Sequence, residues 1–160
     1  MIFITLGSQD RAFPRILRAV ETQINKGVIK EEVIAQIGST DFKSDKMKII
    51  KLTKSFDEYM DYIERASLII THGGVGSILD GITHNKKVIA IPRLKKYGEN
   101  TNDHQIQIIE KFSEEKYIIG IDNVSGLGKA IKKSKNFKPK PYKRDNSKML
   151  KTIENFIDNI

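Results

Sequence analysis

A chain of 160 residues with 39% hydrophobic and 30% charged residues has the length and composition of one globular domain. It contains no cysteine, which excludes disulfide bonds and thiolate metal sites and is typical of a reducing compartment. The formal net charge is +8, and the sequence has neither a basic leader nor a run of 18 apolar residues, so we expect a soluble or peripheral protein without a signal peptide or membrane span.

Apolar runs rich in β-branched residues alternate with segments in which apolar residues recur every three or four positions. In chain order this pattern predicts a strand at 2–6, a helix at 14–27, strands at 32–38 and 48–52, a helix at 55–66, a strand at 67–71, a helix at 76–85, a strand at 87–92, a helix at 101–116, a strand at 117–121, and helices at 124–134 and 147–160. Pro14 opens the first helix, and Ser55 with Glu58 forms a capping box. Thr101 or Asn102 is expected to cap the fourth helix.

Strands that alternate with helices predict a parallel sheet with helices on both faces. The expected fold class is therefore α/β, a Rossmann-like parallel sheet of about six strands. Residues 1–134 are expected to form this domain. Residues 135–160 are expected to form a basic connector and a C-terminal amphipathic helix that packs on the domain or on a partner.

The excess positive charge is concentrated near the C-terminus. Residues 129–151 contain ten Lys and Arg residues and a single acidic residue, Asp145. Such a run is typical of a solvated connector, or of a surface attracted to an anionic membrane or an acidic partner. Only Phe137 and Tyr142 interleave the lysines and no RNA-binding motif accompanies them, so we predict no nucleic-acid partner.

Two glycine-containing loops follow predicted strands and precede predicted helices, LGSQD at 6–10 and THGGVGS at 71–77. In parallel sheets, ligands bind at the carboxyl ends of the strands, where helix N-termini attract anions. Glycines let a phosphate approach the backbone amides, His72 and Ser77 offer hydrogen-bond donors, and Asp80 offers an acceptor for sugar hydroxyls. The same residues also fit a simple tight turn in which Ser77 caps the helix and Asp80 complements its dipole.

Other ligand motifs are missing from the sequence. The first loop contains only Gly7, which does not satisfy the G-x-G-x-x-G fingerprint of dinucleotide cofactors, and there is no Walker A motif for ATP. No His, Asp and Glu residues have the spacing of metal ligands, so we predict no metal site and no tightly held cofactor.

The segment NDHQ at 102–105 admits an ordinary structural interpretation. Asn102 and Asp103 are common helix caps, and His104 and Gln105 suit a surface. His84 is interpreted as a helix-end residue. In the preceding loop, Arg93 and Lys96 are interpreted as solvated charges, with a contact to phosphate as the alternative, and no role is assigned to Glu99.

Three segments together resemble one family. IFITLGSQ at the start, THGGVGSILD in the middle and IPRLKKYGENTNDHQ after it are similar, in order and spacing, to the C-terminal, nucleotide-sugar-binding half of GT-B glycosyltransferases, family 28. The resemblance extends over residues 1–135. It is strongest to the small catalytic subunits of two-part UDP-sugar transferases, both the one in dolichol-linked oligosaccharide synthesis and its bacterial capsule and exopolysaccharide counterparts.

The resemblance implies roles for individual residues. In the family pattern H-x-G-x-x-S-x-x-[ED], the histidine and serine contact the diphosphate and the acid contacts ribose, which implies these roles for His72, Ser77 and Asp80. Asp80 is one methylene group shorter than the glutamate common in relatives. The further implied contacts are Gly7, Ser8, Gln9, Gly73, Gly74 and Gly76 at the diphosphate, and Asp103, His104 and Gln105 at the sugar.

The implied activity is that of a hexosyl- or N-acetylhexosaminyltransferase that takes a UDP-sugar as donor substrate and needs no metal. His72 is the implied catalytic residue, because it stabilises the departing UDP. The sequence shows no general base, so a membrane-anchored partner subunit is expected to supply the acceptor side for a lipid-linked saccharide. The resemblance thus implies a cytoplasmic chain held at the inner face of the membrane by its partner. The alternative is a non-catalytic nucleotide-sugar-binding or regulatory subunit.

Overall fold

The computed structural model describes residues 1–142. The predicted helix at 147–160 and the last part of the basic segment lie outside the described residues. Among those described, no helix combines the length and the apolar character needed to cross a bilayer.

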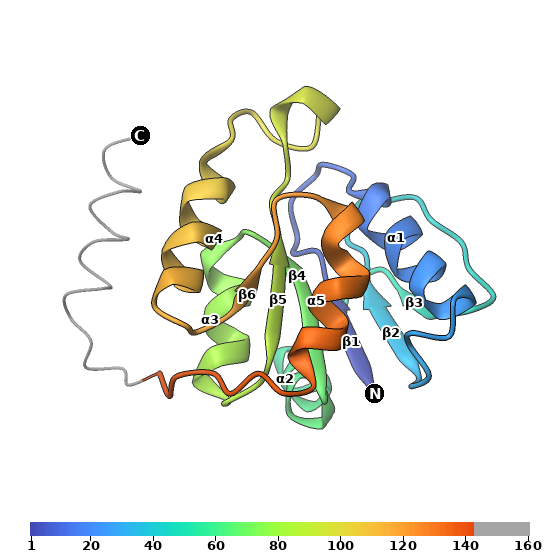
Figure 1. Cartoon of the computed structure of the whole chain (residues 1–160). Coiled ribbons are helices and arrows are strands. Elements are labelled where there is room, and N and C mark those ends of the chain that lie inside the picture. The colour runs from blue at the N-terminus through green and yellow to red at the C-terminus, as the bar shows by residue number, and fades with distance from the viewer. Residues whose placement is uncertain (143–160) are drawn as a thin grey trace.

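One parallel sheet forms the centre of the molecule (Figure 1). Its six strands are β1 (Ile2–Thr5), β2 (Val33–Gln36), β3 (Lys48–Ile50), β4 (Leu68–His72), β5 (Val88–Ile91) and β6 (Ile119–Gly120). They lie in the order β3-β2-β1-β4-β5-β6 and all pairs are parallel. The chain builds outward from β1 to one edge and then from β4 to the other, so β1 and β4 flank the point where the strand order reverses. The predicted α/β, Rossmann-like parallel sheet is confirmed.

Helices cover both faces of the sheet, as Figure 1 shows. They are α1 (Pro14–Asn25), α2 (Phe56–Arg65), α3 (Val75–Thr83), α4 (His104–Glu114) and α5 (Leu127–Ser134), with short 3₁₀ turns at Lys95–Tyr97 and Val124–Gly126. The apolar residues of α1 and α5 pack in one core with one face of the sheet. Those of α2, α3 and α4 pack in a second core on the other face. Each central strand is buried on both faces, which explains its continuous apolar sequence.

Most boundaries follow the sequence signals. Pro14 occupies the first turn of α1, and the Ser55 hydroxyl accepts a hydrogen bond from the Glu58 amide at 3.1 Å, as the capping box predicts. The fourth helix begins later than expected, because Asp103 and neither Thr101 nor Asn102 occupies its N-cap position. The predicted strand at 117–121 keeps only two residues in the sheet.

The described part of the C-terminal segment packs on the domain. Phe137 lies against the core beneath α1 and α5, while the Tyr142 ring meets the Tyr117 ring edge-on with centroids 5.6 Å apart. The Lys140 amide donates to the Lys116 carbonyl oxygen at 3.0 Å. Residues 135–142 therefore pass from the core beneath α1 and α5 to the core on the other face of the sheet. The domain boundary at residue 134 stays a prediction.

Candidate functional site

The two glycine loops of the sequence meet at the carboxyl ends of β1 and β4. Gly7 has φ = 71°, a left-handed conformation that favours glycine, and a β-carbon placed on it would lie 2.8 Å from Nε2 of His72. A β-carbon on Gly74 would collide with the same ring from the other side. His72 is thus held between two loops that approach closely only because both carry glycine. We call the space bounded by Gly7, His72 and the first turn of α3 the loop site.

The His72 ring is buried and makes hydrogen bonds at both nitrogens. Nδ1 accepts from the Gly74 amide at 3.0 Å and lies 3.3 Å from Nε2 of Gln105, while Nε2 lies 3.5 Å from the Ser77 hydroxyl. Burial first, and the nearby positive charge of Arg93 second, lower the pKa of His72 to about 4. The ring is therefore neutral at physiological pH.

The first turn of α3 faces the same space. Gly74 is the N-cap residue and no side chain caps the helix, which excludes the interpretation of Ser77 as a cap. The first amides of a helix have no intrahelical acceptor, and the helix dipole makes this end positive. The loop site therefore presents backbone N–H groups, the Ser77 hydroxyl and a neutral imidazole, a set of donors that suits an anion.

A cavity of about 500 Å³ opens beside the loop site. It is lined by Thr5, Gly7, Ser8, Gln36, Leu52, Thr53, Ser55, Phe56, Tyr59, Ser77 and Asp80. The Tyr59 hydroxyl donates to Oδ2 of Asp80 at 3.0 Å. Burial raises the pKa of Asp80, and burial together with the Asp80 charge raises the pKa of Tyr59. Sequence reasoning identified neither Tyr59 nor Phe56 as site residues, because both lie on α2, outside the glycine loops.

The loop after β5 corrects one interpretation of the sequence. Arg93 is not a solvated charge, since its exposed fraction is 1% and its guanidinium donates to the carbonyl oxygens of Leu6 and Arg11 at 2.8 and 2.6 Å. Glu99, which received no role, accepts from Arg15 at 2.8 and 2.9 Å and from the Leu94 amide at 3.0 Å. Arg93 thus ties the loop after β5 to the loop after β1, and Glu99 ties it to α1. Lys96 is exposed, as predicted.

The segment NDHQ divides between surface and interior. Asp103 is exposed and accepts from the Lys95 amide at 2.8 Å, and His104 is half-buried. Gln105 is buried: its Oε1 accepts from the amides of Gly73 and Arg93, and its Nε2 faces His72. The interpretation of Gln105 as a surface residue is therefore wrong. A sugar contact by this segment stays a prediction.

The structure brings most of the predicted residues to the same edge of the sheet. Gly7 and Ser77 border both the loop site and the cavity, Ser8 and Asp80 line the cavity, and Gly73, Gly74 and Gly76 surround the start of α3. Gln9 is exposed and does not line the cavity, and its carbonyl oxygen accepts from the Ser39 hydroxyl at 2.8 Å. Within residues 1–142, no three His, Asp or Glu side chains gather in a way that could hold a metal ion.

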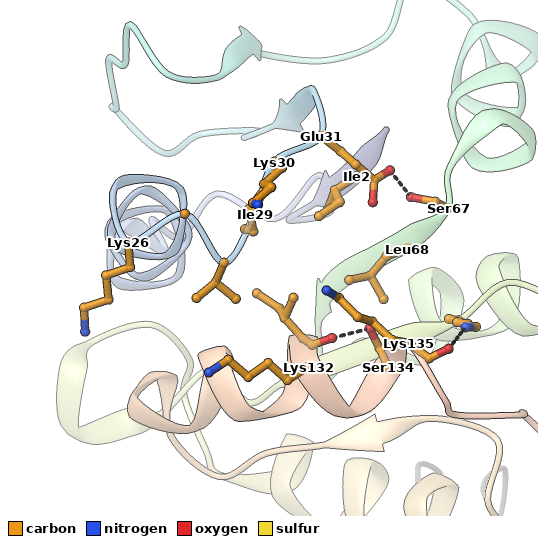
Figure 2. A pocket seen from close by; sticks show the side chains of 14 residues that line it. Ile2, Lys26, Ile29, Lys30, Glu31, Ser67, Leu68, Lys132, Ser134 and Lys135 are labelled. Atoms are coloured by element: carbon orange, nitrogen blue, oxygen red, sulfur yellow. Dashed lines mark hydrogen bonds between the residues drawn. The ribbon is translucent and has the colours of Figure 1, made fainter.

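A larger cavity of about 700 Å³ lies at the opposite edge of the sheet (Figure 2). Its floor includes Ile2, Leu68 and Ile131, from the beginnings of β1 and β4 and from α5. Five lysines line it, namely Lys26, Lys30, Lys87, Lys132 and Lys135. We call it the basic groove. It lacks the glycine loops and free helix amides of the loop site, so we do not assign it to the same ligand.

Comparison with known proteins identifies the family of this chain. The glycosyltransferase family 28 C-terminal domain matches residues 1–160. The UDP-N-acetylglucosamine transferase subunit ALG13 of Candida albicans (strain SC5314 / ATCC MYA-2876) is 35% identical over 78 residues, which are 49% of this chain. That match spans 25% of the relative's own length.

Solved structures agree in fold. The NMR solution structure of ALG13 covers 95% of this chain and 93% of its own, with a TM-score of 0.60 and 22% identity. The crystal structure of the calicheamicin glycosyltransferase CalG4 covers 82% of this chain and 32% of its own, with a TM-score of 0.58 and 14% identity. The architecture is that of the C-terminal half of GT-B glycosyltransferases. With the family match over its whole length, the chain belongs to the glycosyltransferase family 28 C-terminal domain.

Proposed function

We propose that this chain binds the UDP-sugar donor of a glycosyltransferase, with the diphosphate in the loop site. The observation that carries this proposal is the convergence of the neutral His72 ring, the Ser77 hydroxyl and the first amides of α3 on one space beside Gly7. These groups donate hydrogen bonds and carry no negative charge. They suit a diphosphate, whose oxygens accept hydrogen bonds.

The adjacent cavity suits the nucleoside. Asp80 is the only carboxylate in its lining, and it offers acceptor oxygens to ribose hydroxyls, as the family pattern implies. Phe56 lines the cavity and is 71% exposed, so its ring provides a face on which a base can stack. The preference for UDP itself rests on family membership and on the similarity to ALG13, a UDP-N-acetylglucosamine transferase subunit.

The proposed chemistry is stabilisation of the leaving group. When the glycosidic bond to the diphosphate breaks, negative charge develops on the departing UDP. Donors that are already oriented stabilise that charge without reorganisation, which is how His72, Ser77 and the α3 amides would accelerate transfer. A pKa of about 4 makes His72 a hydrogen-bond donor here and not a proton shuttle at neutral pH.

The acceptor side is proposed to come from a membrane-anchored partner subunit. Asp80 already accepts from Tyr59 and faces the proposed nucleoside, so the cavity lining offers no general base for an acceptor hydroxyl. We propose that the partner supplies this base and holds a polyprenyl-diphosphate-linked saccharide, as in capsule or exopolysaccharide synthesis. The chain would then lie on the cytoplasmic side of the membrane.

The basic groove supports attachment to an anionic surface. Lys26, Lys30 and Lys132 have no ion-pair partner among residues 1–142. Figure 2 shows the groove between the end of α1, the beginnings of the central strands and α5. Because the groove lies at the edge opposite the loop site, contact there does not cover the loop site.

Calorimetric titration tests the proposed ligand. UDP is expected to bind more tightly than ADP or GDP, and His72→Ala or Ser77→Ala is expected to weaken UDP binding by about tenfold or more, because a hydrogen bond to a charged group contributes about 1.5–3 kcal/mol. His84→Ala is the matched control, since His84 is exposed at the end of α3. UDP affinity unchanged in both site variants would rule out the assignment of the diphosphate.

Reconstitution separates the transferase from the alternative of a regulatory subunit. The chain is co-expressed with its candidate partner, and transfer from UDP-sugars to a lipid-linked acceptor is measured. Loss of turnover in His72→Ala, with the complex still assembled, supports a catalytic role. Unchanged turnover in that variant would instead support a non-catalytic binding subunit.

A further inference from the structure

The side-chain amide of Gln105 is fixed by two backbone donors. Its Oε1 accepts from the Gly73 amide at 3.0 Å and from the Arg93 amide at 2.9 Å. Neither backbone N–H can accept a hydrogen bond, so the oxygen of the side chain must face them. The NH₂ end of Gln105 consequently faces Nδ1 of His72 at 3.3 Å.

The Gly74 amide also donates to Nδ1 of His72, at 3.0 Å. Both groups around Nδ1 are therefore donors, and this nitrogen must carry the lone pair of a neutral ring. The ring proton then belongs to Nε2, which is the nitrogen that faces Gly7 and the Ser77 hydroxyl.

We propose that Gln105 is a positioning residue that holds His72 as a neutral Nε2–H donor directed into the loop site. Gln105 lies at the start of α4 and acts on the ligand only through His72. The contact between this Nε2–H group and a diphosphate rests on the proposed function. The tautomer rests only on the hydrogen bonds around Nδ1.

The Gln105 side chain connects two loops directly and a third through Arg93. Through Gly73 it holds the loop after β4, and through the Arg93 amide it holds the loop after β5. The guanidinium of Arg93 in turn holds the loop after β1 by donating to the carbonyl oxygens of Leu6 and Arg11. The orientation of His72 is thus coupled to the position of α4.

Nitrogen NMR of the imidazole rings tests the tautomer directly. The chain has three histidines, so spectra of ¹⁵N-histidine-labelled protein are assigned with single His84→Asn and His104→Asn variants. At pH 7 the His72 signals should show a protonated Nε2 and an unprotonated Nδ1. A proton on Nδ1 of His72 in the unmodified chain would overturn the proposal.

Two substitutions isolate the contribution of Gln105. Gln105→Glu keeps an oxygen for the Gly73 and Arg93 amides but replaces the NH₂ donor with a second oxygen, so protonation of Nδ1 is expected. Gln105→Leu removes all three contacts, and a mixture of tautomers is expected. Because Gln105→Glu preserves the backbone contacts, its spectrum stays interpretable if Gln105→Leu does not fold. A His72 spectrum unchanged in Gln105→Glu would contradict the positioning role.

Binding measurements on the same variants separate this inference from the proposed function. A positioning residue predicts that Gln105→Glu weakens UDP and UDP-sugar by a similar factor, about tenfold for a misdirected hydrogen bond to a charged group. A sugar contact predicts weakening of the UDP-sugar alone, which would overturn the positioning role. If the unmodified chain shows the Nε2–H tautomer but binds no UDP, the proposed function fails and the tautomer assignment stands.

Discussion

Gly7 and His72 are packed so closely that a β-carbon on Gly7 would lie 2.8 Å from Nε2 of the ring. The two residues belong to neighbouring strand ends, and their contact brings the two glycine loops together. Gly7 also has φ = 71°, so glycine is favoured there by both backbone conformation and space. The effect of this contact can be separated from the effect of the left-handed backbone by substituting a second glycine that has the same conformation but no close neighbour.

Gly7→Ala should abolish detectable UDP binding, because the added methyl group pushes His72 out of the loop site. It should also lower the free energy of unfolding by more than the roughly 1–2 kcal/mol of a left-handed alanine. Urea denaturation and calorimetric titration measure the two effects separately.

Gly27→Ala is the matched control for this substitution. Gly27 has φ = 69°, but a β-carbon there meets no atom within 4 Å. Gly27→Ala should lower the free energy of unfolding by the roughly 1–2 kcal/mol of a left-handed alanine and keep full UDP affinity. Equal loss of affinity in both variants would show that global destabilisation, and not the displaced ring, reduces binding.

The sequence predicted the sheet well because buried parallel strands are apolar on both faces. The runs around Ile4 and Ile70 have few polar interruptions, and each became a central strand. The edge strand β6 is shorter than its apolar run, since residues near Ile118 are buried without pairing in the sheet. Apolar sequence reports burial, whereas pairing depends on neighbouring strands.

The polar contacts of the site were predicted less completely. The loop sequences placed His72, Ser77 and Asp80 at the right edge of the sheet, because strand ends and helix starts can be read from the pattern. They did not reveal that Arg93 points inward, since its acceptors are carbonyl groups of a loop more than 80 residues earlier. Carbonyl groups occur at every position, so no local pattern distinguishes a buried arginine from a solvated one.

Arg93→Met should lower the free energy of unfolding by roughly 3 kcal/mol, because it removes two hydrogen bonds from a charged donor and leaves the buried Leu6 carbonyl oxygen unpaired. The loop after β1 should then loosen, and amide hydrogen exchange near Gly7 should accelerate. Arg18→Met is the control, since Arg18 is exposed on α1. A change within about 0.5 kcal/mol is expected for Arg18→Met, and a similarly small effect of Arg93→Met would refute the structural role.

Tyr59→Phe should weaken recognition of ribose. The hydroxyl of Tyr59 donates to Asp80 at 3.0 Å, and its loss removes a hydrogen bond that favours the charged carboxylate. UDP should be preferred over 2′,3′-dideoxy-UDP by roughly tenfold in the unmodified chain, and Asp80→Asn and Tyr59→Phe should both reduce this preference. Tyr97→Phe, at an exposed ring outside the cavity, should leave the preference unchanged. A full preference in Asp80→Asn would remove Asp80 from the nucleoside site.

The buried His72 predicts how stability depends on pH. Its pKa is about 4 in the folded chain, against an ordinary value of 6.5. Between these values the unfolded chain binds more protons than the folded chain, so the free energy of unfolding rises with pH. This contribution is complete above pH 6.5 and is lost as the pH falls toward 4. Between pH 7 and pH 5, His72 thus lowers the free energy of unfolding by about 2 kcal/mol.

Urea denaturation at pH 7 and pH 5 gives the free energy of unfolding of the unmodified chain and of His72→Asn. The difference between the two proteins in how this free energy changes with pH is the contribution of His72. Other titrating groups, including Asp80 with its raised pKa, contribute to both proteins and largely cancel. Because this prediction involves no ligand, it tests the burial of His72 independently of the proposed function. The prediction is contradicted if the stability of the unmodified chain falls between pH 7 and pH 5 no more steeply than that of His72→Asn. That result would place His72 in water as an ordinary imidazole, and not in the loop site as a buried neutral donor.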